Sequence, residues 1–458
     1  MEIYNIIAEL CSEIIHFCEE DFFIRFSCVC TDEKNRIDGI IKEKIPGLFE
    51  KDHQVHILTE ADLTDEFYET LMDFIKTLAE EQDYFATVRL IQILDKAVQD
   101  LLREMVKSFQ DEEYSLVMNN NREQTGVGLL PRCGCDWERK GRLAHHYNRL
   151  DNFLFNLLLM ENSILGELID KHIFLKDHFF ERYDETKKLR IAATALKNSK
   201  DFSIANINHE GVNYFQIQYD EEKELVDNEL VWQKICDAAD EQADIVVFPE
   251  MLGNRRMESF VSGRLKGLPE AEREKMPSLI VLPSYWYKGK NTVSVLDKYG
   301  HVLCRQNKQN PFRFEYDGVG CLEGIYTSFM VNIFHYEGIG RFAILICKDF
   351  LTTKYLEQLM RCFKLTLILV PSFSTGSYDF VQSFDLCAHD DCNVVWINTC
   401  AAMEKGKESN FEYVGYVRKR IAKSDDESQK LCHMKSCEGL RNGTCRRDCL
   451  YIEDICAV

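Results

Sequence analysis

Apolar residues recur at intervals of three and four along much of the N-terminal part of the chain, which is the spacing of an amphipathic helix. The pattern predicts helices at 66–82, 84–109 and 146–170. A segment rich in Asn, Gly and Pro at 119–135 indicates a loop between two helical groups. We therefore expect residues 1–187 to form a helical domain, to which the pattern assigns no role.

Beyond about residue 190 the pattern changes to short runs of Val, Ile and Leu that alternate with amphipathic helices. A helix at 222–241 leads directly into a strand at 244–248. Near-continuous apolar runs are typical of strands that are buried on both faces. Further strands are expected at 279–283, 293–297, 302–306, 342–346, 366–370 and 394–398, and further helices at 352–363 and 379–391. The sequence thus predicts an α/β domain at 188–425, followed by a Cys-rich tail at 426–458.

Composition narrows the classes of function. The 458 residues allow two or three domains, and the net charge of -21 argues against nucleic acid as a direct partner. No apolar run approaches the length of a membrane span, and the first residues lack the basic and apolar regions of a secretory signal. We therefore expect a cytoplasmic protein whose 19 scattered cysteines are mostly reduced core thiols.

Three reactive side chains stand at or just beyond buried strands of the α/β part. Glu250 ends the stretch DIVVFPE, Lys308 lies in CRQNKQNPFRFE, and Cys347 follows the strand in FAILICKD. Strand ends are where an α/β scaffold presents side chains to a cleft. A cysteine at a strand-to-helix turn lies near the positive end of the helix dipole, and a nearby ammonium also favours its thiolate.

Together the three groups can carry out acyl-enzyme hydrolysis. The carboxylate of Glu250 can accept the thiol proton and later activate water, while Lys308 and a backbone N–H stabilise the developing negative charge. Each residue alone has a plainer interpretation: Glu250 as a solvated acid, Cys347 as an inert core thiol, and Lys308 as surface charge. The order and the settings of the three favour the catalytic interpretation.

The same order resembles the Glu-Lys-Cys triad of the nitrilase, or carbon–nitrogen hydrolase, superfamily. The hairpin 296–300 (LDKYG), the strand exit 370–372 (VPS) and the strand ending at Asn398 also resemble that family. Glu315, seven positions past Lys308, resembles the family's auxiliary glutamate. The match covers about residues 190–425 and implies a nitrilase-like four-layer α-β-β-α sandwich, here preceded by a helical domain.

The resemblance implies hydrolysis of a non-peptide C–N bond in a small-molecule amide or nitrile, with an amide favoured. Glu250 acts as base, Cys347 forms the thioester, and Lys308 with the Lys348 N–H holds the oxyanion. It implies no cofactor, and homo-oligomers formed through the nitrilase-like domain. The chain departs from the family at Lys348-Asp349 after the cysteine, at Asn310, and in 400–420, where the usual hairpin is not recognisable.

Other interpretations stay open from the sequence. The fold could serve a binding or assembly module without turnover, in a larger system such as bacterial anti-phage defence, with a protein partner for the helical domain. Acyl transfer to an amine shares the same thioester. A structural zinc is a weaker alternative, since neither Cys/His cluster has a C-x-x-C knuckle. These clusters are Cys133, Cys135, His145 and His146, and the tail residues Cys432, His433, Cys437, Cys445, Cys449 and Cys456.

Overall fold

Two seven-stranded sheets form the centre of the computed structural model, which describes residues 2–52, 54–138, 149–316, 318–376, 378–403, 413–419, 431–435 and 449–456. The first sheet has the order β11 (Val302–Asn307), β10 (Lys290–Asp297), β8 (Leu279–Val281), β7 (Ile245–Val247), β4 (Lys188–Ala193) and β20 (Tyr451–Cys456), with β9 (Tyr285–Tyr287) paired to β10. The second has the order β19 (Leu431–Lys435), β18 (Tyr413–Arg418), β17 (Asn393–Ile397), β16 (Leu367–Pro371), β15 (Gly340–Ile344), β14 (Met330–Tyr336) and β3 (Ile169–Phe174).

Alternate residues of the first sheet enter two different apolar cores, because successive side chains of a strand point to opposite faces. Ile245 and Val247 of β7 belong to the core that contains the strands of the second sheet. Val246 between them packs instead with residues of α10 (Glu224–Asp240) and α11 (Met257–Gly267). The first sheet is therefore covered by the second sheet on one face and by helices on the other.

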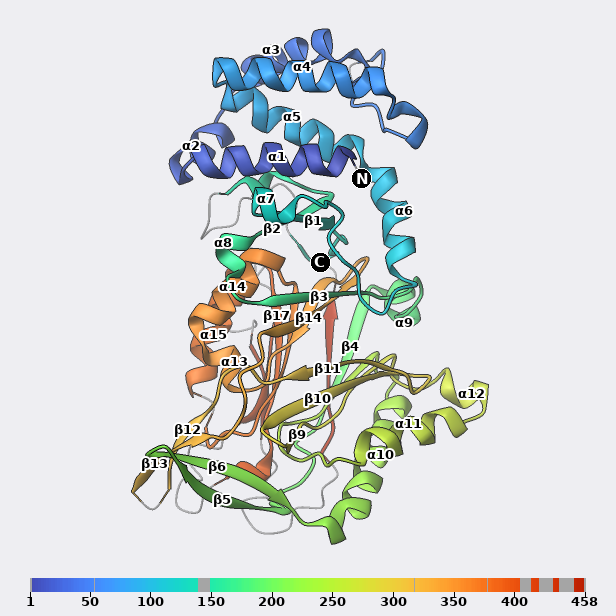
Figure 1. The fold of residues 1–458 in the computed structure, drawn as a ribbon. Helices are drawn as coiled ribbons and strands as arrows, with labels where there is room; N and C mark the ends of the chain where they lie inside the picture. Colours follow the sequence, from blue (N-terminus) through green and yellow to red (C-terminus); the bar gives the residue numbers. More distant parts are fainter. Residues whose placement is uncertain are drawn as a thin grey trace.

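Helices also cover the outer face of the second sheet. They are α13 (Lys348–Leu351), α14 (Thr353–Phe363) and α15 (Tyr378–His389). The ring of Phe380 in α15 packs at a tilt against Trp396 of β17, with ring centroids 4.8 Å apart, and the ring of Phe350 in α13 lies 5.5 Å from that of Phe384. Figure 1 shows the two groups of helices on opposite sides of the sheets. The predicted four-layer α-β-β-α architecture is confirmed.

Six helices form a layer at one end of this body (Figure 1). They are α1 (Glu2–Phe17), α2 (Glu20–Ser27), α3 (Thr31–Lys44), α4 (Asp65–Glu81), α5 (Tyr84–Ala97) and α6 (Gln99–Phe109). The helix predicted at 66–82 is α4, and the one predicted at 84–109 is divided into α5 and α6 at Val98. The short helices of the chain are α7 (Arg122–Thr125), α8 (Asn162–Leu165), α9 (Glu181–Thr186), α12 (Glu270–Arg273), η1 (Pro46–Leu48), η2 (Glu60–Asp62), η3 (Leu150–Phe153), η4 (Glu221–Lys223) and η5 (Cys400–Ala402).

The helix predicted at 146–170 is wrong. Its described part contains β2 (Leu157–Glu161), which pairs antiparallel with β1 (Val127–Pro131), and the start of β3. All five residues of β2 are buried, so the strand is buried on both faces, and its first four residues are apolar. Such a short apolar run has no period that separates a strand from a buried helix.

The strands join the three predicted segments into one body. From the helical segment, β3 pairs parallel with β14, and from the tail β20 pairs antiparallel with β4. The buried guanidinium of Arg341 in β15 donates to the carbonyl of Cys133 at 2.8 Å and to that of Lys364 at 2.7 Å. The ranges 1–187, 188–425 and 426–458 thus share sheets and buried hydrogen bonds.

A smaller sheet, which the sequence pattern did not predict, lies at the end opposite α1–α6 (Figure 1). Its order is β12 (Arg313–Tyr316), β13 (Val319–Glu323), β6 (Val212–Tyr219) and β5 (Phe202–His209). Phe215, Ile217 and Cys321 on its inner face form a buried cluster with Met251, the residue after Glu250. The small sheet therefore covers the strand end that carries Glu250.

Candidate active site

Cys347 lies at a strained turn between β15 and α13. Its backbone has φ 49° and ψ -99°, and its N–H donates to the carbonyl of Pro371 at 2.9 Å. A positive φ is costly for a residue with a Cβ, and such strain is typical of turns that present a reactive side chain. The strand-to-helix turn predicted for this cysteine is present, and it points the thiol into a buried space beside Glu250.

Glu250 joins the two sheets at this point. It follows β7 in the first sheet, and its Oε2 accepts the N–H of Phe373, which follows β16 in the second sheet, at 2.9 Å. The negative charge of the Glu250 carboxylate also raises the pKa of the Cys347 thiol, so the two groups are neighbours. The carboxylate and the thiol therefore meet where the strand ends of the two sheets come together.

Lys308 lies between two carboxylates. Its Nζ is 2.8 Å from Oε1 of Glu250 and 2.7 Å from Oε2 of Glu323, the last residue of β13. Exposed fractions are 2% for Lys308 and 1% for each glutamate, so water screens these charges little. The three residues predicted from the sequence, Glu250, Lys308 and Cys347, are thus brought together, and Glu323 joins them.

Glu315 is not part of this cluster. It lies exposed in β12, opposite Gly320 of β13, and the carboxylate that reaches Lys308 is that of Glu323, 15 positions beyond the lysine. Sequence reasoning missed Glu323 because it expected the second glutamate soon after the lysine. Glu315 lies on the first strand of the β12–β13 hairpin and Glu323 at the end of the second. No fixed spacing from Lys308 therefore identifies the second glutamate.

Asp349, two residues past Cys347, connects the turn that holds Cys347 to the loop that holds Lys308. Its Oδ1 accepts the N–H of Gln309 at 3.0 Å, the N–H of Asn310 at 2.7 Å and the side-chain amide of Asn310 at 2.9 Å. Burial raises the pKa of Asp349 to about 7, against the effect of these donors. The two positions that depart from the family pattern, Asn310 and Asp349, are therefore hydrogen-bonded to each other.

The charges define the resting state of the cluster. Burial and the negative charge of Glu250 raise the pKa of the Cys347 thiol, so the sulfur is protonated. Burial opposes the charge on Lys308, but Glu250 and Glu323 outweigh it and its pKa stands well above the ordinary value. Burial also raises the pKa of Glu250. The expectation of a thiolate stabilised by the following helix is wrong, because α13 has only four residues and burial dominates.

The described residues give no sign of a metal site or of a membrane span. Within the described ranges no three His, Cys, Asp or Glu side chains are placed to hold a metal, and no helix has the length and apolar character needed to cross a membrane. His145, His146, Cys437 and Cys445, and the side chains of Cys432 and His433, lie outside the description.

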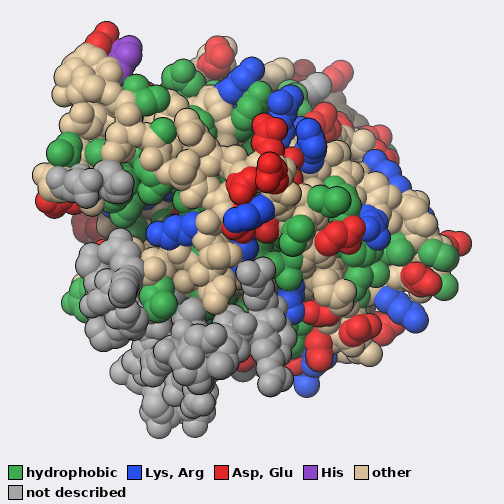
Figure 2. Space-filling view, turned by 90° about the horizontal axis from the view of Figure 1, so that it is seen from below, with side chains coloured by type: hydrophobic (Ala, Val, Ile, Leu, Met, Phe, Trp, Pro, Cys, Tyr) green, Lys and Arg blue, Asp and Glu red, His purple; other side chains and the backbone are tan. Residues whose placement is uncertain are grey.

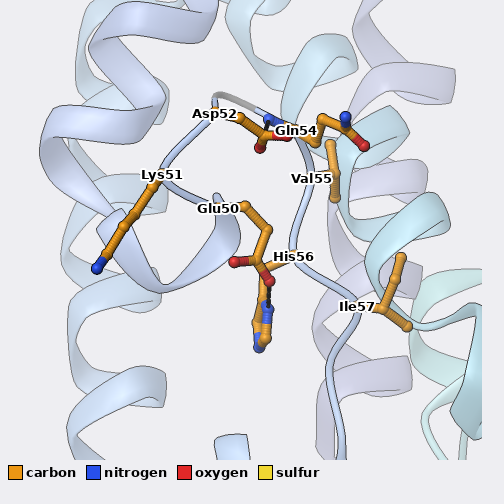
Figure 3. Close-up of a pocket in the computed structure, with 7 residues that line it drawn as sticks. All are labelled: Glu50, Lys51, Asp52, Gln54, Val55, His56 and Ile57. Carbon is orange, nitrogen blue, oxygen red and sulfur yellow. Dashed lines mark hydrogen bonds and ion pairs between the residues drawn. The ribbon is translucent and has the colours of Figure 1, made fainter.

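Two other surfaces, a pocket in the helical layer and the described face at the small sheet, differ from the cluster in the groups that they carry. The pocket of Figure 3 lies in the helical layer and is lined by residues 50–52 and 54–57, where Nδ1 of His56 is 2.5 Å from Oε1 of Glu50. It contains no nucleophile. Figure 2 shows the end that carries the small sheet, where acidic and basic side chains are interspersed on the visible surface. The part of this face that the structure describes shows no extended basic patch for a nucleic acid (Figure 2).

Comparison with known proteins yields only distant likenesses. No protein-family model and no curated protein matches the chain. Among solved structures, the NitN amidase from Nesterenkonia sp. AN1 is 16% identical over 50% of this chain and 85% of that chain, with a TM-score of 0.35. Several of the solved structures that the chain resembles are described as amidases.

Two further structures give the same range of similarity. A mutant of the Nesterenkonia AN1 amidase, described as from the nitrilase superfamily, is 14% identical over 58% of this chain and 90% of that chain, with a TM-score of 0.38. The C. elegans NitFhit protein is 16% identical over 59% of this chain and 61% of that chain, with a TM-score of 0.36.

Proposed function

We propose that this chain is a cysteine-dependent carbon–nitrogen hydrolase of the nitrilase type that acts on a small-molecule amide. The observation that supports it is the buried cluster of the Cys347 thiol with the hydrogen-bonded Glu250 carboxylate and Lys308 ammonium, at the junction of the two sheets. A protonated thiol beside a carboxylate of raised pKa needs no prior ionisation, because the proton can move as the sulfur attacks.

In the proposed first half-reaction the Cys347 sulfur attacks the amide carbon and its proton passes to Glu250. Lys308 and the backbone N–H of Lys348 stabilise the negative charge that develops on the amide oxygen. The same proton then passes from Glu250 to the nitrogen, the C–N bond breaks, and the amine leaves a thioester on Cys347. The raised pKa of Glu250 suits it to hold the proton that the departing nitrogen needs.

In the second half-reaction Glu250 takes a proton from water, and the oxygen of that water attacks the thioester carbon. The C–S bond breaks, the carboxylic acid leaves, and the proton on Glu250 returns to the sulfur. An amine that enters in place of water would complete an acyl transfer by the same steps. A primary or secondary amide fits this sequence better than a nitrile, which has no amine to protonate at the first departure.

The cluster is also compatible with a module that binds without turnover, because the Cys347 side chain and its three neighbours are almost completely buried. In that case the buried ion pairs would serve to hold the small sheet in place. We further propose that the α/β body forms homo-oligomers and that the helical layer binds a protein partner. Sedimentation analysis of the purified chain tests the first point, and crosslinking in cells tests the second.

The test of the catalytic proposal labels the protein with iodoacetamide and maps the adduct by mass spectrometry. We expect alkylation at Cys347 in the wild type and in Cys321→Ala, a control that removes another buried thiol of the same region, but not in Cys347→Ala. Ammonia release is then measured over a panel of primary amides, with hydroxylamine added to detect acyl transfer. An unreactive Cys347 and no ammonia from any amide would favour the binding module.

A further inference from the structure

Asn291, the second residue of β10, contacts every charged member of the cluster. Its side-chain nitrogen donates to Oε1 of Glu250 at 2.7 Å and to Oε1 of Glu323 at 3.1 Å. Its backbone carbonyl accepts the N–H of Lys308 at 2.8 Å. The side chain has no exposed surface, so these contacts are not shared with bulk water. A neutral amide thus lies between two carboxylates that share one ammonium.

The amide can have only one orientation here. Ionised carboxylates accept hydrogen bonds and donate none, so the NH₂ group of Asn291 must face Glu250 and Glu323. Its Oδ1 accepts no hydrogen bond from any residue that the structure describes, although it is buried. An unsatisfied buried acceptor costs free energy. The hydrogen bonds to the two carboxylates outweigh this cost at Asn291. The carboxylates therefore determine the orientation of the amide.

The contacts divide the two oxygens of Glu250 between two tasks. Oε1 is occupied by Lys308 and Asn291, at 2.8 and 2.7 Å. Oε2 accepts the N–H of Phe373 at 2.9 Å and no side-chain donor of the described residues, so it is the oxygen left to take the thiol proton. Without Asn291, Oε1 would keep only the lysine, which Glu323 also holds at 2.7 Å. The carboxylate of Glu250 would then be free to rotate toward the ammonium.

We propose that Asn291 is a positioning residue that locks the Glu250 carboxylate, with Oε2 directed at the Cys347 thiol, by bridging Glu250 to Glu323. The inference rests on the proposed function, because it assigns Asn291 to the proton transfer between thiol and carboxylate. Two carboxylates close to one ammonium repel each other, and two N–H donors between them offset part of that repulsion. Loss of the bridge therefore affects the rate of proton transfer more than the binding of substrate.

The experiment measures the rate at which iodoacetamide alkylates Cys347, from pH 5 to pH 9, by peptide mapping of the full chain. Asn291→Leu keeps the size of the side chain but removes both donors, and Asn291→Ser keeps one donor in a smaller residue. Thr292→Val is the matched control, because Thr292 is the next residue of β10, has its side chain on the other face and also loses one hydrogen bond, to Asn307. Thermal unfolding establishes that each variant is folded.

We expect Asn291→Leu to slow alkylation roughly tenfold or more, a part of the 10²–10⁴ that a positioned base supplies, and to move the acid limb of the profile to higher pH. Asn291→Ser should lie between Asn291→Leu and the wild type, and Thr292→Val should match the wild type. On an amide substrate, kcat should fall while KM stays within about threefold, since ground-state binding does not use the bridge.

A folded Asn291→Leu whose profile superimposes on that of the wild type overturns the inference and leaves the proposed function intact. If Asn291→Leu does not fold, Asn291→Ser decides in the same way. A fall in rate equal to that of Thr292→Val also overturns the inference, because it would reflect a general disturbance of β10. If wild-type Cys347 does not react at any pH, the proposed function itself fails, and the inference fails with it.

Discussion

Replacing Lys308 by Met tests the charge arrangement of the cluster directly. The ammonium hydrogen-bonds to Glu250 at 2.8 Å and to Glu323 at 2.7 Å, and all three side chains are buried. Methionine fills the space of the lysine stem but leaves two carboxylates without a cation. Removal of one partner from a buried ion pair costs about 3–5 kcal/mol, and we expect the free energy of unfolding to fall by that amount at pH 8.

The cost should depend on pH with a definite sign. Burial already raises the pKa of Glu250, and loss of the ammonium raises it further, so proton uptake stabilises the folded form. The penalty is full above the raised pKa and disappears as the pH falls to the ordinary range of a glutamate, about 4. The difference in unfolding free energy between Lys308→Met and wild type should therefore be smaller at pH 5 than at pH 8.

Urea unfolding at the two pH values, followed by circular dichroism, measures these differences. Lys197→Met is the matched control, because Lys197 is also buried and pairs with two carboxylates, Asp201 and Asp227, each at 2.7 Å. Those carboxylates are 12% and 15% exposed and can be hydrated, so we expect a smaller cost and retained alkylation of Cys347. Equal and pH-independent costs for the two variants, or a Lys308→Met chain with normal thiol reactivity, would refute the reasoning.

Three further predictions follow from the same geometry. Glu323→Gln should lower amide turnover by about 10² or more, whereas Glu315→Gln, at an exposed position, should stay within about twofold; equal effects of the two would contradict the placement of the second glutamate. Burial raises the pKa of Asp349 to about 7, so the free energy of unfolding should fall by about 4 kcal/mol as the pH rises from 4 to 7. Asp349→Asn should remove this dependence on pH, as measured by urea unfolding from pH 4 to 8. Arg341→Met should lower the unfolding free energy by about 3–5 kcal/mol, because it leaves the carbonyls of two segments without their buried donor; a loss below 1 kcal/mol in urea would show that the guanidinium does not hold them.

The elements that were predicted correctly are those whose apolar pattern fits only one kind of secondary structure. The strands β7, β8, β15, β16 and β17 lie within a few residues of their predicted positions, since each is an apolar run buried on both faces. The amphipathic helices α4, α10 and α14 also lie where their apolar periodicity indicated. Both signals arise within one segment, so a single sequence is enough to detect them.

The elements that were missed depend on contacts between distant segments. The strands β5 and β6 are half-exposed and contain many polar residues, and only their pairing with β13 places them over the site. Glu323 reaches Lys308 because of the β12–β13 hairpin, and no local sequence pattern predicted that hairpin. Whether Cys347 would be a thiolate depended on its burial, and burial is a property of the whole fold.

The layout of the body separates the proposed active site from the helical layer. The strand β15 runs from Gly340, which lies against Cys135 of the N-terminal part, to the turn that holds Cys347. The helical layer lies at one end of the body and the small sheet at the other (Figure 1). A partner bound to α3 or α4 would therefore lie away from the small sheet, and any influence on Cys347 would pass through the body between them. Arg341, at the second position of β15, is the buried group where such an influence would enter, because its guanidinium bonds to both the N-terminal segment and the loop before β16.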